Sequence, residues 1–146
     1  MTIPVETVYS AGKMAAGRRQ IYVGSAGTLE GQLSGRVLPG GTDHLLIDAD
    51  GLGLVDARLT WELDGGVIVY VQYIGRLMMN DKVAEAFKSG GETQFGDTNH
   101  LVQIRFETGN EQYSWLNATT AIGEGRIAKG GCIQYNIYRC DTSQAQ

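Results

Sequence analysis

The sequence predicts an all-β protein, built as a closed, mostly antiparallel β-barrel with one short helix. Candidate strands follow one another through almost the whole chain, and only one segment between them has helical character. Glycine supplies 21 of the 146 residues and proline only 2, a composition typical of a fold with many tight turns. One strand, Val67–Ile74, is apolar on both faces, as expected of a barrel wall that also packs against something outside.

The length and composition indicate a single domain spanning residues 1–146, large enough to bury a core without disulfides or metal. Two cysteines, Cys132 and Cys140, are too few for a disulfide framework. Sixteen acidic against 12 basic residues give a net charge of −4, which argues against a nucleic-acid partner. No apolar run approaches the roughly 20 residues that span a bilayer, and no signal-peptide pattern opens the chain. We therefore expect a cytoplasmic protein without a membrane partner.

Eight strands follow from the alternation of side chains and from the turn residues, and a ninth, Thr7–Ser10, is weaker. The eight are expected at Gln20–Val23, Gln32–Leu38, His44–Ala49, Leu54–Glu62, Val67–Ile74, Leu101–Thr108, Gln112–Ile122 and Cys132–Tyr138. Glycine-containing turns separate them, such as Asp64-Gly65-Gly66, because glycine adopts positive φ at little steric cost.

One helix is expected between Asn80 and Gly90. Asn80 can cap its first turn and Gly90 can end it. The residues that share one apolar face are Val83, Ala86 and Phe87. This face would pack on the sheet or cover a mouth of the barrel.

The strand Val67–Ile74 also bears on assembly. One face carries Val67, Val69, Val71 and Tyr73, and the other carries Ile68, Tyr70, Gln72 and Ile74. Whichever set faces outward needs to be covered by the helix or by another subunit. We therefore expect a homo-oligomer, a dimer or larger.

Motifs for familiar chemistries are missing from the sequence. It contains no GxSxG, GxxxxGK[ST], HExxH or CxxC pattern. His44 and His100 fall in different strands without the spacing of paired metal ligands. We therefore expect no cofactor, neither a metal nor a flavin.

The segment Leu38–His44 is a first candidate for chemistry. Its Pro-Gly-Gly turn would project Asp43 and His44 at the rim of the barrel. An aspartate beside an imidazole can hold the tautomer of the ring and raise its basicity, as a general base requires. The alternative is an Asx turn with a solvated histidine.

A predicted hairpin is the second candidate, with Arg105 and Glu107 on one strand and Tyr113, Trp115 and Asn117 on the next. If the two faces coincide inside the barrel, they line a pocket suited to small aromatic or oxygenated ligands. The alternative is an exposed cross-strand pair of Arg105 and Glu107, which contributes only a few tenths of a kcal/mol.

These segments resemble a known family. The strings are Val37-Leu38-Pro39-Gly40-Gly41-x-Asp43, Asp56-Ala57-Arg58, Arg105-Phe106-Glu107-Thr108-Gly109 and Tyr113-x-Trp115-Leu116-Asn117, with Gly17-Arg18-Arg19 and Gly27-Thr28-Leu29-Glu30-Gly31 before them. Over residues 17–139 they match, in order and spacing, the small bacterial and fungal family known as domain of unknown function 3237. The resemblance implies a closed antiparallel barrel with a central cavity, similar to the allene-oxide-cyclase and dirigent barrels, and cofactor-free chemistry in that cavity.

The sequence departs from the family pattern at His44, where the family often has tryptophan, and at Ile104, where a proline is common. Residues 2–12 match it poorly. The change at His44 replaces an inert ring with a titratable one, which favours acid–base chemistry.

Two functions follow as hypotheses. The first is a cofactor-independent lyase, hydratase or isomerase acting on a small aromatic or oxygenated carbonyl compound. Asp43 and His44 would be its acid–base pair, with Glu107 as the next candidate base. Arg58 and Arg105 would stabilise an enolate or bind a carboxylate. The ligand would be oriented by Tyr73, Trp115 and Asn117. The second hypothesis is a non-catalytic barrel that binds a small molecule.

Overall fold

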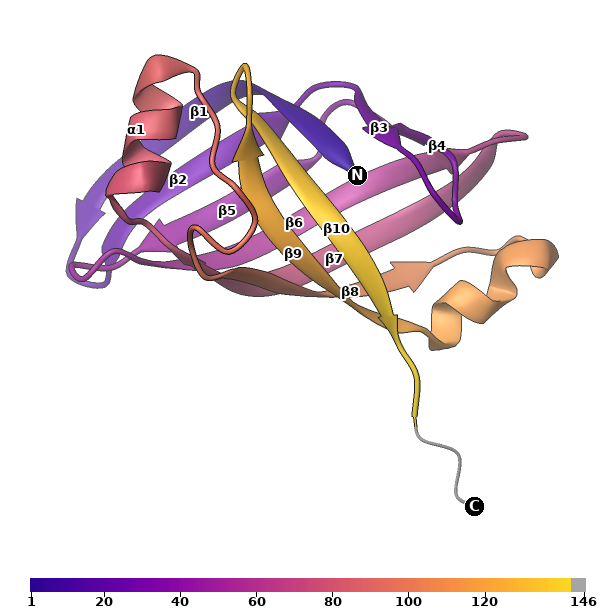
Figure 1. Ribbon diagram of the computed structural model, residues 1–146. Helices are drawn as coiled ribbons and strands as arrows, with labels where there is room; N and C mark the ends of the chain where they lie inside the picture. Colours follow the sequence, from indigo (N-terminus) through magenta and orange to yellow (C-terminus); the bar gives the residue numbers. More distant parts are fainter. Residues whose placement is uncertain (143–146) are drawn as a thin grey trace.

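The computed structural model describes residues 1–142 and shows ten strands, one α-helix and one 3₁₀-helix (Figure 1). The strands are β1 (Thr2–Met14), β2 (Gly17–Gly24), β3 (Gly27–Leu29), β4 (Gly35–Val37), β5 (Thr42–Ile47), β6 (Leu52–Leu63), β7 (Val67–Met78), β8 (His100–Glu107), β9 (Thr120–Ala128) and β10 (Cys132–Cys140). The helices are α1 (Asp81–Ser89) and η1 (Glu111–Ala118).

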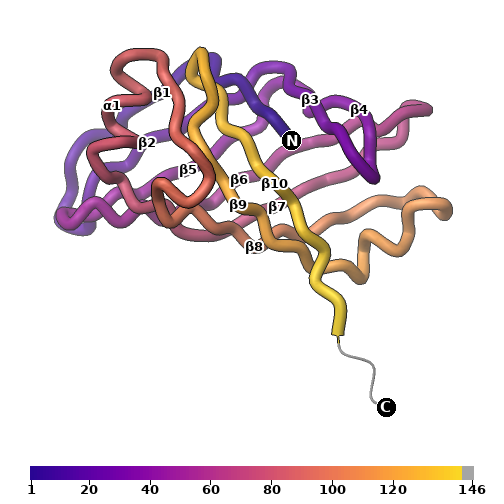
Figure 2. Tube along the Cα trace, in the orientation of Figure 1, coloured from indigo at the N-terminus to yellow at the C-terminus, as the bar shows by residue number. Residues whose placement is uncertain are grey.

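The strands close into a ring in the order β1-β2-β5-β6-β7-β8-β9-β10, because β10 pairs back onto β1. Every strand pairing among the described residues is antiparallel, from the β6–β7 hairpin with its turn Asp64-Gly65-Gly66 to the closing contact of Ile3 with Ile133. The short strands β3 and β4 form a bridge from β6 to β1 at one end of the ring. The Cα trace in Figure 2 shows the N-terminal end of β1 beside β10, where the ring closes. The predicted antiparallel barrel with one short helix is confirmed.

The core lies inside this ring. Along β6 and β8 every second residue is buried, and the sets that face inward are the bulky apolar ones. Their members include Val55, Ala57, Leu59, Trp61 and Leu63 on β6 and Val102, Ile104 and Phe106 on β8. The charged residues of the same strands face outward.

Helix α1 lies at one end of the barrel, as the left side of Figure 1 shows. Asn80 caps it by accepting a hydrogen bond from the Val83 N–H (3.0 Å), and Gly90 ends it in the left-handed conformation, φ 68°. Val83 and Ala86 are buried, and Phe87 packs on Tyr22 of β2. The helix therefore covers a mouth of the barrel, one of the two roles expected for its apolar face.

Two expectations about strands are wrong, and a third gives the strand too short. The segment predicted as the strand Gln112–Ile122 begins as η1, because the side chain of Asn110 accepts a hydrogen bond from the Tyr113 N–H and caps a helical turn. The predicted strand Gln32–Leu38 is reduced to β4, with β3 before it. The weaker strand expected at Thr7–Ser10 is present, as part of the longer β1, whose pairing with β2 has two irregularities.

The outer face of β7 carries Ile68 and Ile74, each about half exposed at 51%. Helix α1 lies at the barrel end and leaves both uncovered. The dimer or larger assembly expected from this strand remains a prediction, for which light scattering is the direct measurement. Within the described residues, no helix is both long enough and apolar enough to cross a bilayer.

Substituting Asn80→Ala should lower the free energy of unfolding by about 1 kcal/mol, because the first turn of α1 loses its cap. The same change removes the hydrogen bond from Asn80 Nδ2 to the Asp97 carbonyl (2.9 Å). Urea denaturation measures the loss. Asn99→Ala, at an exposed asparagine near the same loop, is the matched control and should leave stability within about 0.5 kcal/mol of the wild type.

Candidate functional site

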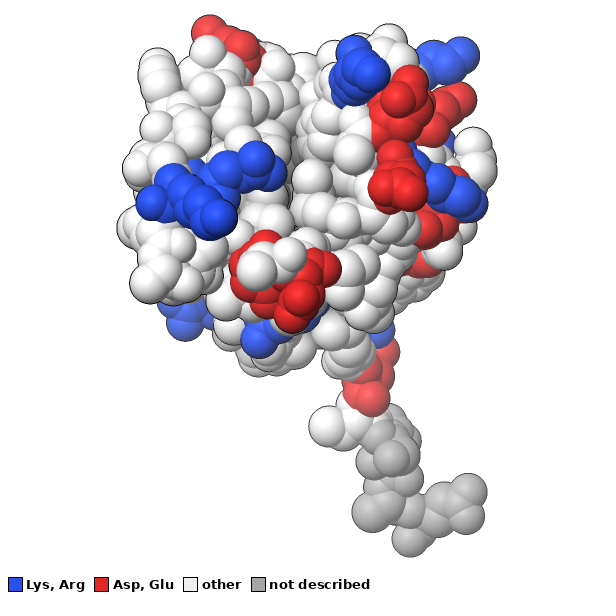
Figure 3. Space-filling view, turned by 90° about the vertical axis from the view of Figure 1, so that its left-hand side faces the viewer, with Lys and Arg blue, Asp and Glu red and all other residues white. Residues whose placement is uncertain are grey.

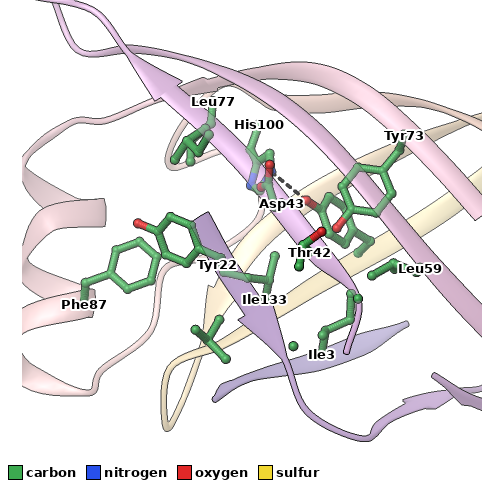
Figure 4. Close-up of a pocket in the computed structure, with 15 residues that line it drawn as sticks. Ile3, Tyr22, Thr42, Asp43, Leu59, Tyr73, Leu77, Phe87, His100 and Ile133 are labelled. Carbon is green, nitrogen blue, oxygen red and sulfur yellow. Dashed lines mark hydrogen bonds between the residues drawn. The ribbon is translucent and has the colours of Figure 1, made fainter. Parts of the chain in front are cut away.

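A cavity of about 50 Å³ lies inside the barrel at the end that α1 covers (Figure 4). Its walls are mostly apolar, from Ile3 and Val5 on β1 to Leu77 on β7 and Ile133 on β10. The polar residues that line it are Tyr22, Thr42, Asp43, Tyr73, His100 and Tyr135. An apolar chamber with a few convergent polar groups is the usual form of a small-molecule site.

Asp43 reaches the cavity because of its place in β5, where alternate side chains face inward. The β5–β6 ladder pairs Asp43 with Ala57 and resumes only at Leu46 with Leu54. Within this gap the Asp43 Oδ1 accepts a hydrogen bond from the backbone N–H of Asp56 (3.2 Å). The Asp43 carboxylate therefore takes the place of a backbone carbonyl as the acceptor, and this hydrogen bond holds the carboxylate in the wall of the cavity.

Burial raises the pKa of the Asp43 carboxyl from 3.8 to about 6. The N–H of Asp56 lowers the pKa, the charge of Asp56 raises it, and the Arg19 guanidinium lowers it. Burial dominates because the apolar walls deprive the charged form of water. At neutral pH the group is mostly ionised, yet it is a far stronger base than an exposed aspartate.

Three phenols share the cavity with this carboxylate. Tyr73 and Tyr135 are buried, with ring centroids 5.4 Å apart. Tyr22 is half-buried, and its hydroxyl donates to Gln20 Oε1 (3.1 Å). Burial raises the pKa of all three phenols, and the charge of Asp43 raises each further. The tyrosines therefore stay protonated at neutral pH and serve as hydrogen-bond donors.

His100 lies behind Tyr135, with its Nε2 3.0 Å from the Tyr135 Oη (dashed line in Figure 4). Burial lowers the pKa of the imidazole from 6.5 to about 4, so the ring is neutral at pH 7. Its Nδ1 has no hydrogen-bond partner among the described residues. The tautomer with its hydrogen on Nε2 avoids a buried, unpaired N–H. In that tautomer the ring donates to the Tyr135 oxygen, and the Tyr135 hydroxyl donates in turn to Tyr73.

Two glycines of β9 make room for these rings. A Cβ at Gly125 would lie 2.4 Å from the His100 Nδ1, and one at Gly123 would lie 3.2 Å from the Tyr135 ring. The first distance is a clash that only glycine avoids. The position of the imidazole is therefore determined by a missing side chain on the neighbouring strand.

An outer cleft of about 410 Å³ leads toward the cavity between α1 and the β1–β2 hairpin. Tyr22 and Phe87 line both the cleft and the cavity, and their ring centroids are 6.1 Å apart. Figure 3 views this side of the molecule and shows charged side chains gathered around a mostly uncharged central furrow. The aromatic pair therefore forms the partition between the solvent-side cleft and the polar interior.

The structure separates the predicted pair of Asp43 and His44. His44 is exposed on the outer face of β5, where its Nε2 lies 3.2 Å from the Thr42 Oγ1. Asp43 lines the cavity whereas His44 projects outward, so the two side chains do not meet at one site. The placement of His44 at the mouth of the pocket is wrong.

Three other predicted residues, Arg58, Arg105 and Glu107, lie on the outer surface of β6 and β8. Arg58 forms an ion pair with Asp56 (2.8 Å), and Gln72 of β7 lies between Arg58 and Arg105 in the sheet register. None of the three lines the cavity with Asp43. Of the two alternatives for this face, the structure shows the exposed one, because the bulkier apolar set of β8 occupies the interior.

Trp115 and Asn117 belong to η1, at the opposite end of the barrel from α1 (orange coil in Figure 1). The Asn117 side chain is used structurally, because its Oδ1 accepts from the Thr108 N–H and its Nδ2 donates to the Thr108 carbonyl. Trp115 lines a separate hollow at that end. Of the predicted ligand-orienting residues, only Tyr73 shares the cavity with Asp43.

Sequence reasoning missed Tyr22, His100 and Tyr135. A signal for two of them exists in β9, where Gly123 and Gly125 stand two apart on the interior face, whose other residues are apolar. Such glycines mark a close approach by a large group. Among the described residues, no group of three His, Cys, Asp or Glu side chains could hold a metal ion.

Residues 1–140 match the model of a family described as "Protein of unknown function (DUF3237)". The chain therefore belongs to the DUF3237 family. Similar proteins carry the name UPF0311. One from Rhodopseudomonas palustris is 31% identical over 124 residues, which cover 84% of this chain and 81% of the relative. One from Clostridium acetobutylicum is 36% identical over 104 residues, 68% of this chain and 64% of the relative.

Solved structures share the fold. A beta-barrel like protein from Acinetobacter baumannii matches with a TM-score of 0.77 and 30% identity, covering 94% of this chain and 89% of that protein. A conserved protein of unknown function from R. palustris matches with a TM-score of 0.84 and 27% identity, covering 94% and 91%. An enzyme from Penicillium herquei matches with a TM-score of 0.66 at 19% identity, covering 94% and 89%, and shares the fold alone.

Asp43→Asn should change how stability depends on pH. The raised pKa of Asp43 removes stability as the pH rises from about 4 to about 6, by on the order of 2–3 kcal/mol, because the folded state holds this proton more tightly. The lowered pKa of His100 adds a similar amount between about 4 and 6.5, because there the unfolded state holds the proton. In the wild type, Asp43 and His100 therefore change the free energy of unfolding with pH in opposite directions.

The variant keeps an acceptor for the Asp56 N–H and removes only the titration of Asp43. Its stability should therefore rise steeply with pH through this window, and at pH 7 it should exceed that of the wild type. Urea denaturation across the pH range measures both effects. Asp50→Asn, at an exposed carboxyl, should follow the wild-type curve. Parallel curves for Asp43→Asn and wild type would contradict the burial of this carboxyl.

Proposed function

We propose that this member of the DUF3237 family is a cofactor-independent enzyme that moves a proton on a small aromatic or oxygenated carbonyl compound, as a lyase, hydratase or isomerase does. One observation carries the proposal. A buried carboxyl whose pKa is about 6 faces the same cavity as three protonated tyrosines. A base of raised pKa beside neutral hydrogen-bond donors is the combination that enolisation requires.

Asp43 is the base in this proposal. Its carboxylate accepts a proton from the carbon next to the substrate carbonyl, and the electron pair of the broken C–H bond moves onto the carbonyl oxygen as an enolate. The resulting carboxylic acid then returns the proton, to another carbon in an isomerase or to a departing oxygen in a lyase. A pKa near 6 supports both halves of the cycle, because the group is mostly ionised before the first step and acidic enough to reprotonate after it.

The phenol of Tyr73 is the donor to the enolate oxygen, and the Tyr135 hydroxyl supports it by donating to Tyr73. Neutral donors fixed in an apolar chamber stabilise a developing negative charge without solvent reorganisation. His100 acts through Tyr135 as a positioning residue, since its neutral ring holds the phenol oxygen at 3.0 Å. The imidazole itself does not titrate near neutral pH, because burial lowers its pKa to about 4.

The size of the cavity limits the substrate. A space of about 50 Å³ admits a few water molecules, whereas a ring compound needs more. We therefore place the reacting carbonyl in the cavity and bring the remainder of the substrate in past Tyr22 and Phe87, which must swing aside toward the outer cleft. One protein of this fold, from Penicillium herquei, is an enzyme, so the barrel is compatible with catalysis, although a shared fold does not assign an activity.

The direct test follows deuterium uptake by NMR in a panel of carbonyl compounds, beginning with dihydroxyacetone, acetylacetone and acetophenone. The protein should accelerate exchange of the protons next to the carbonyl in at least one member. The rate should rise with pH through about 6 and then level off, because ionisation of Asp43 creates the base. Asp43→Asn should reduce the rate about 10²–10⁴-fold.

His44→Phe should keep the wild-type rate, because that ring lies outside the barrel. Tyr73→Phe should slow exchange without shifting the pH midpoint, since it removes a donor and leaves the base. If Asp43→Asn exchanges as fast as the wild type, the base lies elsewhere. If compounds bind in the cavity without exchange or turnover, the protein is the non-catalytic binding barrel, and the enzyme proposal is wrong.

A further inference from the structure

A row of polar side chains leads from the acid–base cavity toward solvent along one face of β2. Tyr22, Gln20 and Arg18 alternate along this strand, so all three project to the same face. Tyr22 lines the interior cavity, and all three residues line the outer cleft of about 410 Å³. The cavity and the cleft therefore share this strand face as a wall, with Arg18 at its exposed end.

The register between β2 and β5 gives the separation of Arg18 from the proposed base. Asp43 pairs with Tyr22, and Ile47, four residues further along β5, pairs with Arg18. Leu45 and Ile47 are buried, so this face of β5 points inward beyond Asp43. At about 3.3 Å per residue, Arg18 lies roughly 13 Å along the sheet from Asp43. A single-ring carbonyl compound with a substituent opposite the carbonyl has the length to contact both.

The charge of the cleft selects an anion. Arg18 is the only charged residue among those that line it. The Arg18 side chain is exposed and forms no ion pair with any residue that the structure describes. Lys13 of β1 lies directly opposite Arg18 in the β1–β2 ladder, so two cations project side by side. Because like charges in this arrangement repel each other, an anion beside them would be stabilised by both.

Acidic residues around the cleft leave these two cations unmatched. Asp48 and Asp50, in the turn next to the hairpin, form no ion pair with a described residue. The Asp48 Oδ1 instead accepts hydrogen bonds from two backbone N–H groups that follow it (2.9 Å each). Glu6 of β1 is exposed and lies outside the lining of the cleft. Helix α1, which forms the opposite wall, carries two acidic and two basic residues and adds no net charge.

Tyr22 and Gln20 connect the two charged ends of the row. Burial raises the pKa of the Tyr22 phenol most, the charge of Asp43 raises it further, and the Arg18 guanidinium lowers it. The phenol is therefore within reach of both charges. Its hydroxyl points away from Tyr73 in Figure 4 and donates to Gln20 Oε1 (3.1 Å). The amide nitrogen of Gln20 forms no hydrogen bond with a described residue, so it is a further donor for a ligand in the cleft.

We infer that the outer cleft binds a carboxylate of the substrate through Arg18, with Lys13 beside it. A guanidinium matches a carboxylate with two parallel hydrogen bonds. The inference rests on the proposed function, because Asp43 places the other end of the molecule, and it narrows the substrate class to aromatic ketones with a carboxylate across the ring from the reacting carbonyl. Arg18 determines which compound binds and takes no part in the proton transfer.

The test compares para-acetylbenzoate with para-acetylbenzamide, which have nearly the same shape and differ in charge. Deuterium uptake into the acetyl group is followed by NMR at subsaturating concentration. The benzoate should exchange about ten-fold faster than the benzamide. Arg18→Gln should remove this preference by slowing the benzoate and leaving the benzamide within about two-fold. Arg76→Gln removes the same charge from an exposed position on the outer face of β7 and should keep the preference.

Calorimetry separates failure of this inference from failure of the proposed function. Asp43→Asn removes the proposed base and leaves the cleft unchanged, so it should still bind para-acetylbenzoate. Adding Arg18→Gln should weaken that affinity about ten-fold, and Arg18→Lys, which keeps the charge, should weaken it less.

Binding that depends on Arg18, without exchange by the wild type, would support the carboxylate site and overturn the role of Asp43 as base. Equal exchange rates for the benzoate and the benzamide, or an affinity for the benzoate that Arg18→Gln does not change, would overturn the carboxylate site and leave the proposed function standing. Absence of both binding and exchange for the benzoate would also overturn the carboxylate site.

Discussion

The closing contact between β1 and β10 is the interaction on which the rest of this barrel depends. Only residues 2–4 of β1 pair with β10, and from Val5 onward the strand pairs with β2 instead. This change of partner converts an open sheet into a ring and removes the free edge that β10 would otherwise present. It also brings Ile3 and Val5 into the wall of the cavity. The apolar enclosure that raises the pKa of Asp43 to about 6 therefore rests on a short pairing at the start of the chain.

The polar groups enclosed by this ring reduce the stability of the fold. Asp43 must ionise away from water, and His100 must give up its proton on folding at mildly acidic pH. Strand β9 reduces the stability further, because Gly123 and Gly125 have no side chains to pack in the core. Their absence makes room for the rings of Tyr135 and His100. A core built only for stability would fill these positions with apolar side chains. Retention of a carboxylate, an imidazole and phenols in one dry chamber is typical of a functional site.

Much of the fold could be predicted because its signals are local. Asn80 and Gly90 mark the two ends of α1, and alternation identifies β6, β8 and β10 within a few residues. The prediction failed at residues 112–118, where alternating large and small side chains imitate a strand. The cap that Asn110 provides, together with the packing of Leu116 into the core, favours a 3₁₀ turn there instead. Such short-range competition between a cap and a periodic pattern is settled by tertiary packing, which the sequence does not display.

Only part of the candidate site could be predicted from the sequence, because the alternation of side chains along a strand leaves one choice open. Alternation shows that Asp43 and His44 lie on opposite faces, and likewise Arg105 and Phe106, but it does not say which face is inside. The choice is made by the total apolar volume of each face summed over neighbouring strands. On β8 that sum puts Val102, Ile104 and Phe106 inside and Arg105 outside. On β5 it puts Leu45 and Ile47 inside, and Asp43 goes with them.

The choice of which strand faces point inward also determines what chemistry the cavity can support. With the arginines outside, the groups that can meet a developing oxyanion are the phenols of Tyr22, Tyr73 and Tyr135, which are neutral. A buried arginine would lower the pKa of Asp43 and weaken it as a base, whereas phenols donate hydrogen bonds without cancelling its charge. The carboxylate thus keeps the basicity that burial gives it while the oxyanion still finds donors. A single interior charge surrounded by neutral donors is therefore better suited to proton transfer than the pair of arginines that the sequence pattern suggested.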